Sequence, residues 1–399
     1  MGIEAVDAPR TGLRPLTKDG YLSAFLLALL TTAGLFYVNI MAAIVTGLSD
    51  GLGFSIKDAG LVGSANVYGA AGGSLIAVFI VKRLPWRRTA AMLLGFLLAL
   101  DLLSILVTTP AVMIGLRFLH GVVGGCSVGI GLSVIARTSV PDRAFAMLLA
   151  VQYFFGGLGV MVLPGLVPLF GTKVLFLSLA GFTAVALALL PFLPPYPPRE
   201  VAALAPGPVR GQVRLTPLVL TFTAMFLFQT ANMAIAAYVI ELGRHFGLSQ
   251  EVISPSLGIA GWAGILGAVL VMALAGKAGR FWPLIGVYLA TMGGTWAYYW
   301  SGHASIYFLA SMITSITWAF AIPYIYGMSA EFDTAGQMTA LAGFFSKLGL
   351  ATGPAVGAFI LAGNDYGLLI NVAVAGILLS GIAAIWPAIL SDRAKRALR

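Results

Sequence analysis

The chain has 399 residues, of which 59% are hydrophobic and 9% are charged. Soluble globular domains are usually about 45–50% apolar and about 25% charged, so this composition excludes a soluble globular protein. It also excludes disorder, which requires few apolar residues. The formal net charge is +9, and the distribution of the basic residues attributes it to membrane topology and not to nucleic-acid binding. The sequence therefore predicts an all-α integral membrane protein.

Apolar runs of roughly 20 residues, the length that crosses a bilayer as a helix, follow one another between charged residues and Pro/Gly breaks. A polar N-terminal tail at 1–20 precedes them and a basic tail at 391–399 follows them. Twelve spans are predicted, at 21–48, 58–81, 89–108, 111–137, 144–170, 173–191, 216–241, 252–275, 282–300, 306–328, 336–361 and 367–389.

Basic residues predict the orientation of these spans. With a cytoplasmic N-terminus, most of the 23 Lys and Arg residues fall in cytoplasmic segments, whereas the outer loops hold Lys57, Lys173 and Arg244. Positively charged loops stay on the cytoplasmic side, so both termini are expected in the cytoplasm. The expected location is the inner (cytoplasmic) membrane, with multiple crossings.

The two halves of the chain, 21–193 and 216–390, resemble each other. A proline-rich and charged segment at 194–215 separates them and is expected to be a cytoplasmic linker. Phe154, Phe155, Leu158, Gly159 and Pro164 in the first half match Phe344, Phe345, Leu348, Gly349 and Pro354 in the second, in the same order. Parallel repeats of this kind are related by an axis along the membrane normal, which places a cavity between two six-helix bundles.

The run RFLHGVVGG, Arg117 to Gly125, resembles the fourth-helix motif R-x-x-x-G-x-x-G of the major facilitator superfamily. This resemblance covers nearly the whole chain and implies the family's fold, transport by alternating access, and a cavity lined by helices 1, 4, 7 and 10. The basic loops at 82–88 and 277–280 resemble degenerate copies of another family motif. The first helix offers Asn39 where many drug/proton antiporters carry an acid, which argues against proton-coupled drug export.

Asp101, Arg117, His120 and Lys347 lie well inside predicted spans, where a charge costs at least about 2.5–3.5 kcal/mol. Asp101 and Arg117 sit at similar depth on consecutive helices, so we expect an ion pair. His120 lies one turn from Arg117. These residues form either a structural cluster or, alternatively, a proton-coupling site in which Asp101 or His120 takes up the proton.

Lys347 lies about eleven residues into the eleventh span, and its repeat-related position is Gly157. It is either a buried structural lysine or a cation that binds an anion beside the cavity. We favour the second interpretation.

Aromatic walls with a few amides suit a small organic molecule that has an apolar body and hydrogen-bonding edges. The residues expected to bind the substrate are Lys347, Arg117, Gln229, Asn232, Asn39, Tyr37, Trp318 and Tyr324.

We therefore expect a secondary active transporter of a small organic anion, for example an aromatic carboxylate, that acts as a symporter or antiporter with protons or a counter-substrate. Alternatives are a proton-coupled exporter of amphipathic drugs, a neutral-solute porter and a non-transporting membrane sensor. Motifs of zinc proteases, serine hydrolases and phosphate-binding loops are absent from the sequence, so no enzyme activity is expected. The single cysteine, Cys126, predicts a buried packing residue. We expect no cofactor, no metal, no nucleic-acid partner and a monomer in the lipid bilayer.

Overall fold

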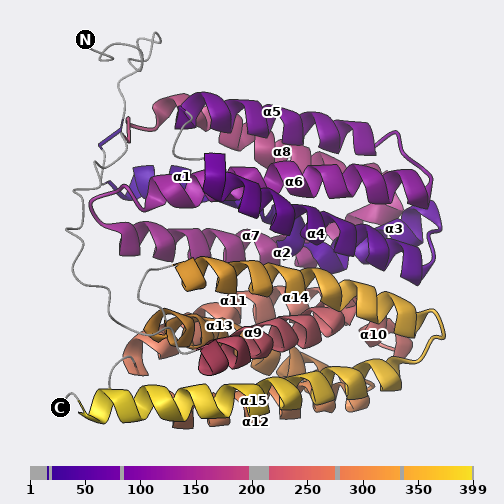
Figure 1. The fold of residues 1–399 in the computed structure, drawn as a ribbon. Coiled ribbons are helices and arrows are strands. Elements are labelled where there is room, and N and C mark those ends of the chain that lie inside the picture. Colours follow the sequence, from indigo (N-terminus) through magenta and orange to yellow (C-terminus); the bar gives the residue numbers. More distant parts are fainter. Residues whose placement is uncertain are drawn as a thin grey trace, which may run out of the picture.

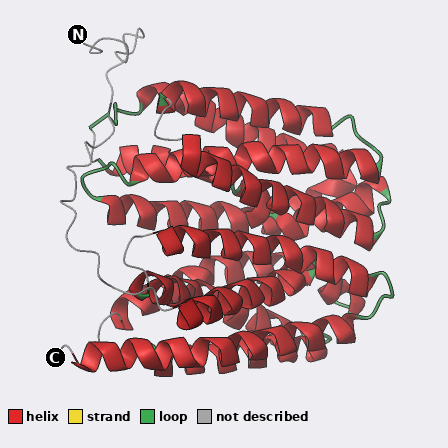
Figure 2. Ribbon diagram, viewed as in Figure 1, coloured by secondary structure: helices red, strands yellow, loops and turns green. Residues whose placement is uncertain are grey.

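The structure, a computed structural model, describes residues 16–17, 20–80, 85–196, 215–274, 279–332 and 337–397. Within these ranges the chain forms helices joined by loops, and no strand is present (Figure 2). Most of the predicted N-terminal tail and linker lies outside the described residues, as do the end of the basic tail and much of the basic loops at 82–88 and 277–280. The predictions made for those segments stay predictions.

The first half of the chain begins with a helix that is broken twice. Residues Tyr21–Leu52, read from the sequence as one continuous span to residue 48, form three pieces that are interrupted near Gly34 and Ile40. A Cβ on Gly34 would lie 2.5 Å from the carbonyl oxygen of Gly124, so the break lets the chain pass close to the fourth predicted span. The elements are α1 (Tyr21–Ala33), α2 (Phe36–Asn39), α3 (Met41–Leu52), α4 (Ile56–Ile80), α5 (Trp86–Ser104), α6 (Pro110–Ile135), α7 (Pro141–Phe170), α8 (Lys173–Leu189) and η1 (Leu190–Phe192).

The second half repeats this order, including a break in its first span. The predicted run 216–241 is divided at Ala237 and Tyr238, and the last helix continues to Ala397, past the predicted end of the membrane span. The elements are α9 (Leu215–Ala236), α10 (Val239–His245), α11 (Gln250–Leu274), α12 (Phe281–Ala297), η2 (Tyr298–Trp300), α13 (Ala304–Glu331), α14 (Gln337–Leu361) and α15 (Tyr366–Ala397).

The helices run roughly along one common direction and gather into two groups, α1–α8 and α9–α15 (Figure 1). The start of α1 and the end of α15 lie on the same side of the molecule, which we call the terminal face; the other end of the helices is the opposite face.

Eight helices of the described part are long and apolar enough to cross a membrane. Three of the four other predicted spans fall short for visible reasons. The first span is interrupted, α12 has 17 residues, and α5 carries Arg87, Arg88 and Asp101. The structure therefore supports a polytopic helical membrane protein, whereas the count of twelve spans and the orientation of the termini stay predictions.

Glycines allow α4 and α6 to pack with their backbones in contact. A Cβ on Gly69 or Gly73 of α4 would lie 2.1 Å or 2.0 Å from a carbonyl oxygen of α6. A Cβ on Gly121 or Gly125 of α6 would lie 1.9 Å or 2.2 Å from a carbonyl oxygen of α4. Small residues permit such close approach between membrane helices. Cys126 follows these glycines and is buried, as the sequence predicts.

The two halves meet along two helix pairs, α4 with α14 and α7 with α11. The Ser64 hydroxyl donates to the carbonyl of Ala351 at 2.5 Å, and the Trp262 indole N–H donates to the carbonyl of Phe154 at 3.1 Å. One cluster of buried apolar residues includes members of both halves, and two further clusters each belong to a single half. These contacts hold the halves together around the cavity described next.

Candidate functional site

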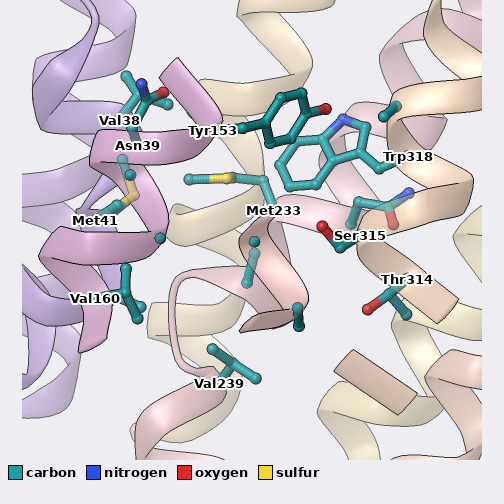
Figure 3. A pocket seen from close by; sticks show the side chains of 18 of the residues that line it. Val38, Asn39, Met41, Tyr153, Val160, Met233, Val239, Thr314, Ser315 and Trp318 are labelled. Atoms are coloured by element: carbon teal, nitrogen blue, oxygen red, sulfur yellow. The ribbon is translucent and has the colours of Figure 1, made fainter. Parts of the chain in front are cut away.

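A cavity of about 450 Å³ lies between the two halves (Figure 3). No Asp, Glu, Lys, Arg or His side chain is among the described residues that line it. Its lining comes from the break between α1 and α3, from α7, from α9–α13 and η2, and from α14. The polar and aromatic members are Asn39, Gln152, Tyr153, Gln229, Asn232, Thr295, Tyr298, Ser311, Thr314, Ser315 and Trp318.

Gln229 and Asn232 share a face of α9, as the sequence predicts from their spacing of three residues. The side-chain carbonyl of Gln229 accepts a hydrogen bond from the Trp318 indole N–H at 2.7 Å. Its amide donates to the hydroxyl of Ser346 at 2.7 Å. The amide of Asn232 donates to the carbonyl of Phe228 at 2.8 Å, which leaves the Asn232 side-chain oxygen as an acceptor. The arrangement holds Trp318 in place and presents one amide oxygen beside it.

Asn39 enters the cavity from the first half because the first span is broken. It ends α2, and Val38 and Met41 line the cavity beside it. The Asn39 amide nitrogen is buried and has no hydrogen-bond partner in the described part of the chain. This amide group can therefore donate to a solute that carries a hydrogen-bond acceptor.

Tyr153 and Gln152 of α7 also line the cavity, and neither residue was predicted from the sequence. Figure 3 shows the Tyr153 ring beside the Trp318 ring, so an aromatic side chain from each half meets its counterpart across the cavity. The family resemblance predicts cavity residues on spans 1, 4, 7 and 10, whereas α7 corresponds to the fifth predicted span. Gln152 could have indicated that this span lines the cavity. It is a polar residue in a mostly apolar span, two turns after Phe145 and followed by Gly156 and Gly157.

Asp101, Arg117 and His120 form a buried cluster outside the cavity lining. The Arg117 guanidinium lies 2.9 Å from the Asp101 carboxylate, which is the ion pair that the sequence predicts. The same carboxylate lies 3.2 Å from His120 Nε2, and Asn66 Nδ2 lies 2.8 Å from His120 Nδ1. Arg117 also donates to Ser104 and to the carbonyl of Leu100. Arg117, expected to bind substrate, is instead engaged within the first half.

Tyr37 and Tyr324 likewise do not line the cavity. The Tyr37 ring is buried against the ion cluster, with its centroid 5.6 Å from the guanidinium carbon of Arg117. Tyr324 stacks on Phe320 with ring centroids 4.8 Å apart. Both rings make these contacts to residues of their own half.

Lys347, which the sequence analysis places beside the cavity as an anion-binding cation, makes its contacts elsewhere in this structure. Its ammonium group does not line the cavity. It donates instead to the hydroxyl of Ser74 on α4, and Ser74 donates to the carbonyl of Gly125 at 3.3 Å. The lysine therefore belongs to the α4–α14 contact between the halves, and the predicted anion site made by Lys347 with Arg117 is not assembled.

Two groups of apolar helices with a cavity between them are the architecture expected of a membrane transporter. The family model of the Major Facilitator Superfamily matches residues 24–354, and the chain belongs to this family. It is thus a multi-pass membrane transporter of a small molecule, and not an enzyme.

The fold resembles the crystal structure of a mutant of the nucleoside transporter NupG, with a TM-score of 0.70. The two chains are 13% identical, and the match covers 92% of this chain and 98% of the other. Similarity at this identity establishes the fold alone. A search of curated proteins gave no match.

Proposed function

We propose that this protein carries a small uncharged organic solute across the membrane by alternating access. The observation that carries the proposal is the cavity of about 450 Å³ between the halves, whose described lining holds no charged side chain. An ion in such a cavity would lose its hydration without gaining a counter-charge, and that loss is costly. A neutral solute needs only hydrogen bonds and apolar contact, which this lining supplies.

Amides and aromatic rings give the cavity its recognition chemistry. Asn39, Gln152 and Asn232 offer amide donors and acceptors from both halves, while Tyr153 and Trp318 offer flat apolar surfaces. A few fixed polar groups among apolar walls are typical of sites for small organic molecules. Tyr and Trp suit flat solutes, because their rings bury a large area in defined geometries.

The organic-anion hypothesis loses its principal support in this structure. It depends on Lys347 and Arg117, and both side chains bond to protein groups outside the cavity lining. The neutral-solute alternative requires neither residue. It therefore fits the geometry better than transport of a carboxylate.

Contacts across the opposite face support alternating access. Arg244 of α10 pairs with Asp50 of α3 at 2.9 Å, and the Lys57 ammonium lies 5.0 Å from the ring centroid of Phe359. These contacts join the halves between the cavity and the opposite face. We propose that two six-helix bundles, 21–193 and 216–390, with twelve spans and cytoplasmic termini, rock about the cavity and exchange this closure for one at the terminal face.

Nucleosides are the first solutes to test. They are uncharged, and they combine a flat heterocycle with hydrogen-bonding edges, which are the features that the lining can contact. The structural likeness to the nucleoside transporter NupG gives an independent reason to begin with them.

The test is uptake into liposomes that contain the purified protein. We expect labelled uridine to accumulate by counterflow and to be displaced by uncharged nucleosides but not by benzoate. Asn232→Leu should weaken uptake, whereas Asn371→Ala, which changes an exposed asparagine of α15, should leave it unchanged. Lys347→Met should retain the affinity for uridine. Competition by carboxylates together with loss of uptake in Lys347→Met would instead establish an anion transporter.

A further inference from the structure

We propose that four hydroxyl groups of the second half, those of Tyr298, Ser311, Thr314 and Ser315, form a subsite for a hydroxyl-rich edge of the solute, such as a sugar ring or a polyol. The inference rests on the proposed function, because it assigns the substrate class of the same cavity. We call these four residues the hydroxyl subsite.

The positions of these residues form a continuous polar stripe. Ser311, Thr314, Ser315 and Trp318 follow one another on α13 at the spacing i, i+3, i+4 and i+7, which places them on one helix face. All four line the cavity, and Tyr298 of η2 lines it beside them. Figure 3 shows Ser315 below Trp318, and Thr314 further along the wall, below Ser315. The stripe thus continues the wall that begins at the Trp318 ring.

Hydrogen bonds within the subsite are long enough to be exchanged for bonds to a ligand. The Tyr298 hydroxyl lies 3.2 Å from Ser311 Oγ and 3.4 Å from Thr314 Oγ1. Bonds between hydroxyl groups are usually about 2.7–2.8 Å long. Thr314 donates to the carbonyl of Ala310 at 2.9 Å, so its oxygen can accept from a solute. Each hydroxyl oxygen carries two acceptor lone pairs, and the subsite therefore has unused acceptors.

The part of the first-half wall that faces the hydroxyl subsite is mostly apolar, with Asn39 as a polar member. Val38, Met41 and Val160 of the first half are apolar, and Figure 3 shows them across the cavity from Thr314 and Ser315. This asymmetry orients a solute. Its hydroxyl-bearing edge faces α13 and η2, and its flat part contacts the Tyr153 and Trp318 rings.

The alternative is that these hydroxyl groups only join α13 to η2. The structural role and the binding role differ in what changes when a hydroxyl group is removed. A purely structural role changes the transport of every solute alike. A binding role changes only the preference for hydroxylated solutes, since the missing bond is made to the solute. The ratio of affinities within a matched pair of solutes therefore separates the roles.

The experiment measures competition by two pairs of uncharged probes, uridine with dideoxyuridine and glucose with deoxyglucose, in liposomes that contain the full-length protein. We expect the wild type to prefer the fully hydroxylated member of at least one pair. Thr314→Val and Ser311→Ala should each reduce that preference about fivefold, as expected for loss of one hydrogen bond. The matched control is Thr317→Val, because Thr317 bonds the carbonyl of Thr314 at 3.2 Å but does not line the cavity.

Three results would overturn the subsite. The first is equal affinity of the wild type for both members of each pair, and the second is an unchanged preference in both variants. The third is transport of uncharged solutes without any binding of uridine or glucose, which would leave the proposed function standing. Transport restricted to ions would overturn both proposals. Thermal unfolding of each variant verifies that the protein remains folded, and Ser311→Ala serves where Thr314→Val does not fold.

Discussion

The indole N–H of Trp318 donates to the side-chain carbonyl of Gln229 at 2.7 Å, which joins α13 to α9 beside the cavity. Gln229 in turn donates to Ser346 of α14, so one amide group connects three helices. The plane of the Trp318 ring is thereby fixed before any solute arrives. A preorganised ring lowers the entropy lost on binding.

Gln229→Leu should remove this arrangement while keeping the side chain large and apolar. The variant leaves the Trp318 N–H and the Ser346 hydroxyl without their partner, and a buried donor left unsatisfied costs about 1–3 kcal/mol. We expect a lower unfolding temperature and weaker solute binding. Both quantities are measured on detergent-purified protein by thermal unfolding and by tryptophan fluorescence titration.

The comparison variant is Trp318→Phe, which keeps a ring and removes the N–H. If the bond acts as described, the double variant should be less destabilised than the sum of the two single variants. Strictly additive effects would show that Gln229 and Trp318 act independently.

Parts of this site can be predicted from sequence because they depend on helix spacing or on consecutive helices. Gln229 and Asn232 are polar residues three apart in an apolar span, so they share a helix face, and the family resemblance implies that this span lines the cavity. The ion pair of Asp101 with Arg117 followed from their similar depth on consecutive helices. The partners that fix Gln229, Trp318 and Ser346, lie far away in the sequence, and their contacts with it were not predicted.

Lys347 could not be placed in this way. Its depth in the span was readable, but its partner Ser74 lies 273 positions away in the sequence, on a helix of the other half. Periodicity tells which residues share a face and does not tell which helix covers that face. Tyr153 was missed for the same reason, because its contact with the cavity depends on how α7 packs against α11.

The breaks in the first and seventh spans were also outside the reach of the sequence pattern. Both runs are predominantly apolar from end to end, and hydropathy cannot show where a helix is interrupted. The interruption near Gly34 follows from a backbone contact with Gly124 on a distant helix. That break brings Asn39 to the cavity, so part of the site depends on tertiary packing.

The cluster of Asp101 and Arg117 should behave as a structural pair. Both side chains are fully buried, and removing one partner from a buried ion pair destabilises by about 3–5 kcal/mol. We expect Asp101→Leu and Arg117→Met to reduce folded protein strongly, and the double variant to recover most of the loss, since it leaves no unpaired charge. Fluorescence-detected size exclusion after heating measures all three.

The conservative variant Asp101→Asn distinguishes a structural role of the cluster from a proton-coupling role. Because the cluster lies outside the cavity lining, uptake by this variant should show the pH profile of the wild type after correction for the amount of folded protein. A flattened profile would demonstrate that Asp101 or its neighbour His120 couples protonation to transport.

The glycines between α4 and α6 should tolerate no side chain. A Cβ on Gly121 would lie 1.9 Å from the carbonyl oxygen of Asn66, so Gly121→Ala must push the helices apart. Overpacking of this kind costs about 1–3 kcal/mol, and we expect a lower unfolding temperature in detergent. Gly115→Ala on the same helix is the control, because a Cβ at Gly115 meets nothing within 4 Å. A higher unfolding temperature in both variants would show that the better helix propensity of alanine, and not the contact, determines the result.

The pair of Asp50 and Arg244 should bias the protein toward closure at the opposite face. Arg244 also lies 3.2 Å from Glu241, so Arg244→Gln leaves two carboxylates without the cation between them. Both partners are partly exposed, and pairs of that kind contribute about 0.2–1 kcal/mol. We therefore expect opening at this face to rise by roughly twofold to fivefold.

The measurement is the labelling rate of Val239→Cys by a membrane-impermeant thiol reagent, in a protein that also carries Cys126→Ser. High salt should mimic the substitution, because screening weakens exposed pairs. Lys173→Gln, which removes an exposed charge on the same face, should leave the labelling rate unchanged. An Arg244→Gln rate equal to that of the parent at every salt concentration would show that the apolar contacts alone keep this face closed.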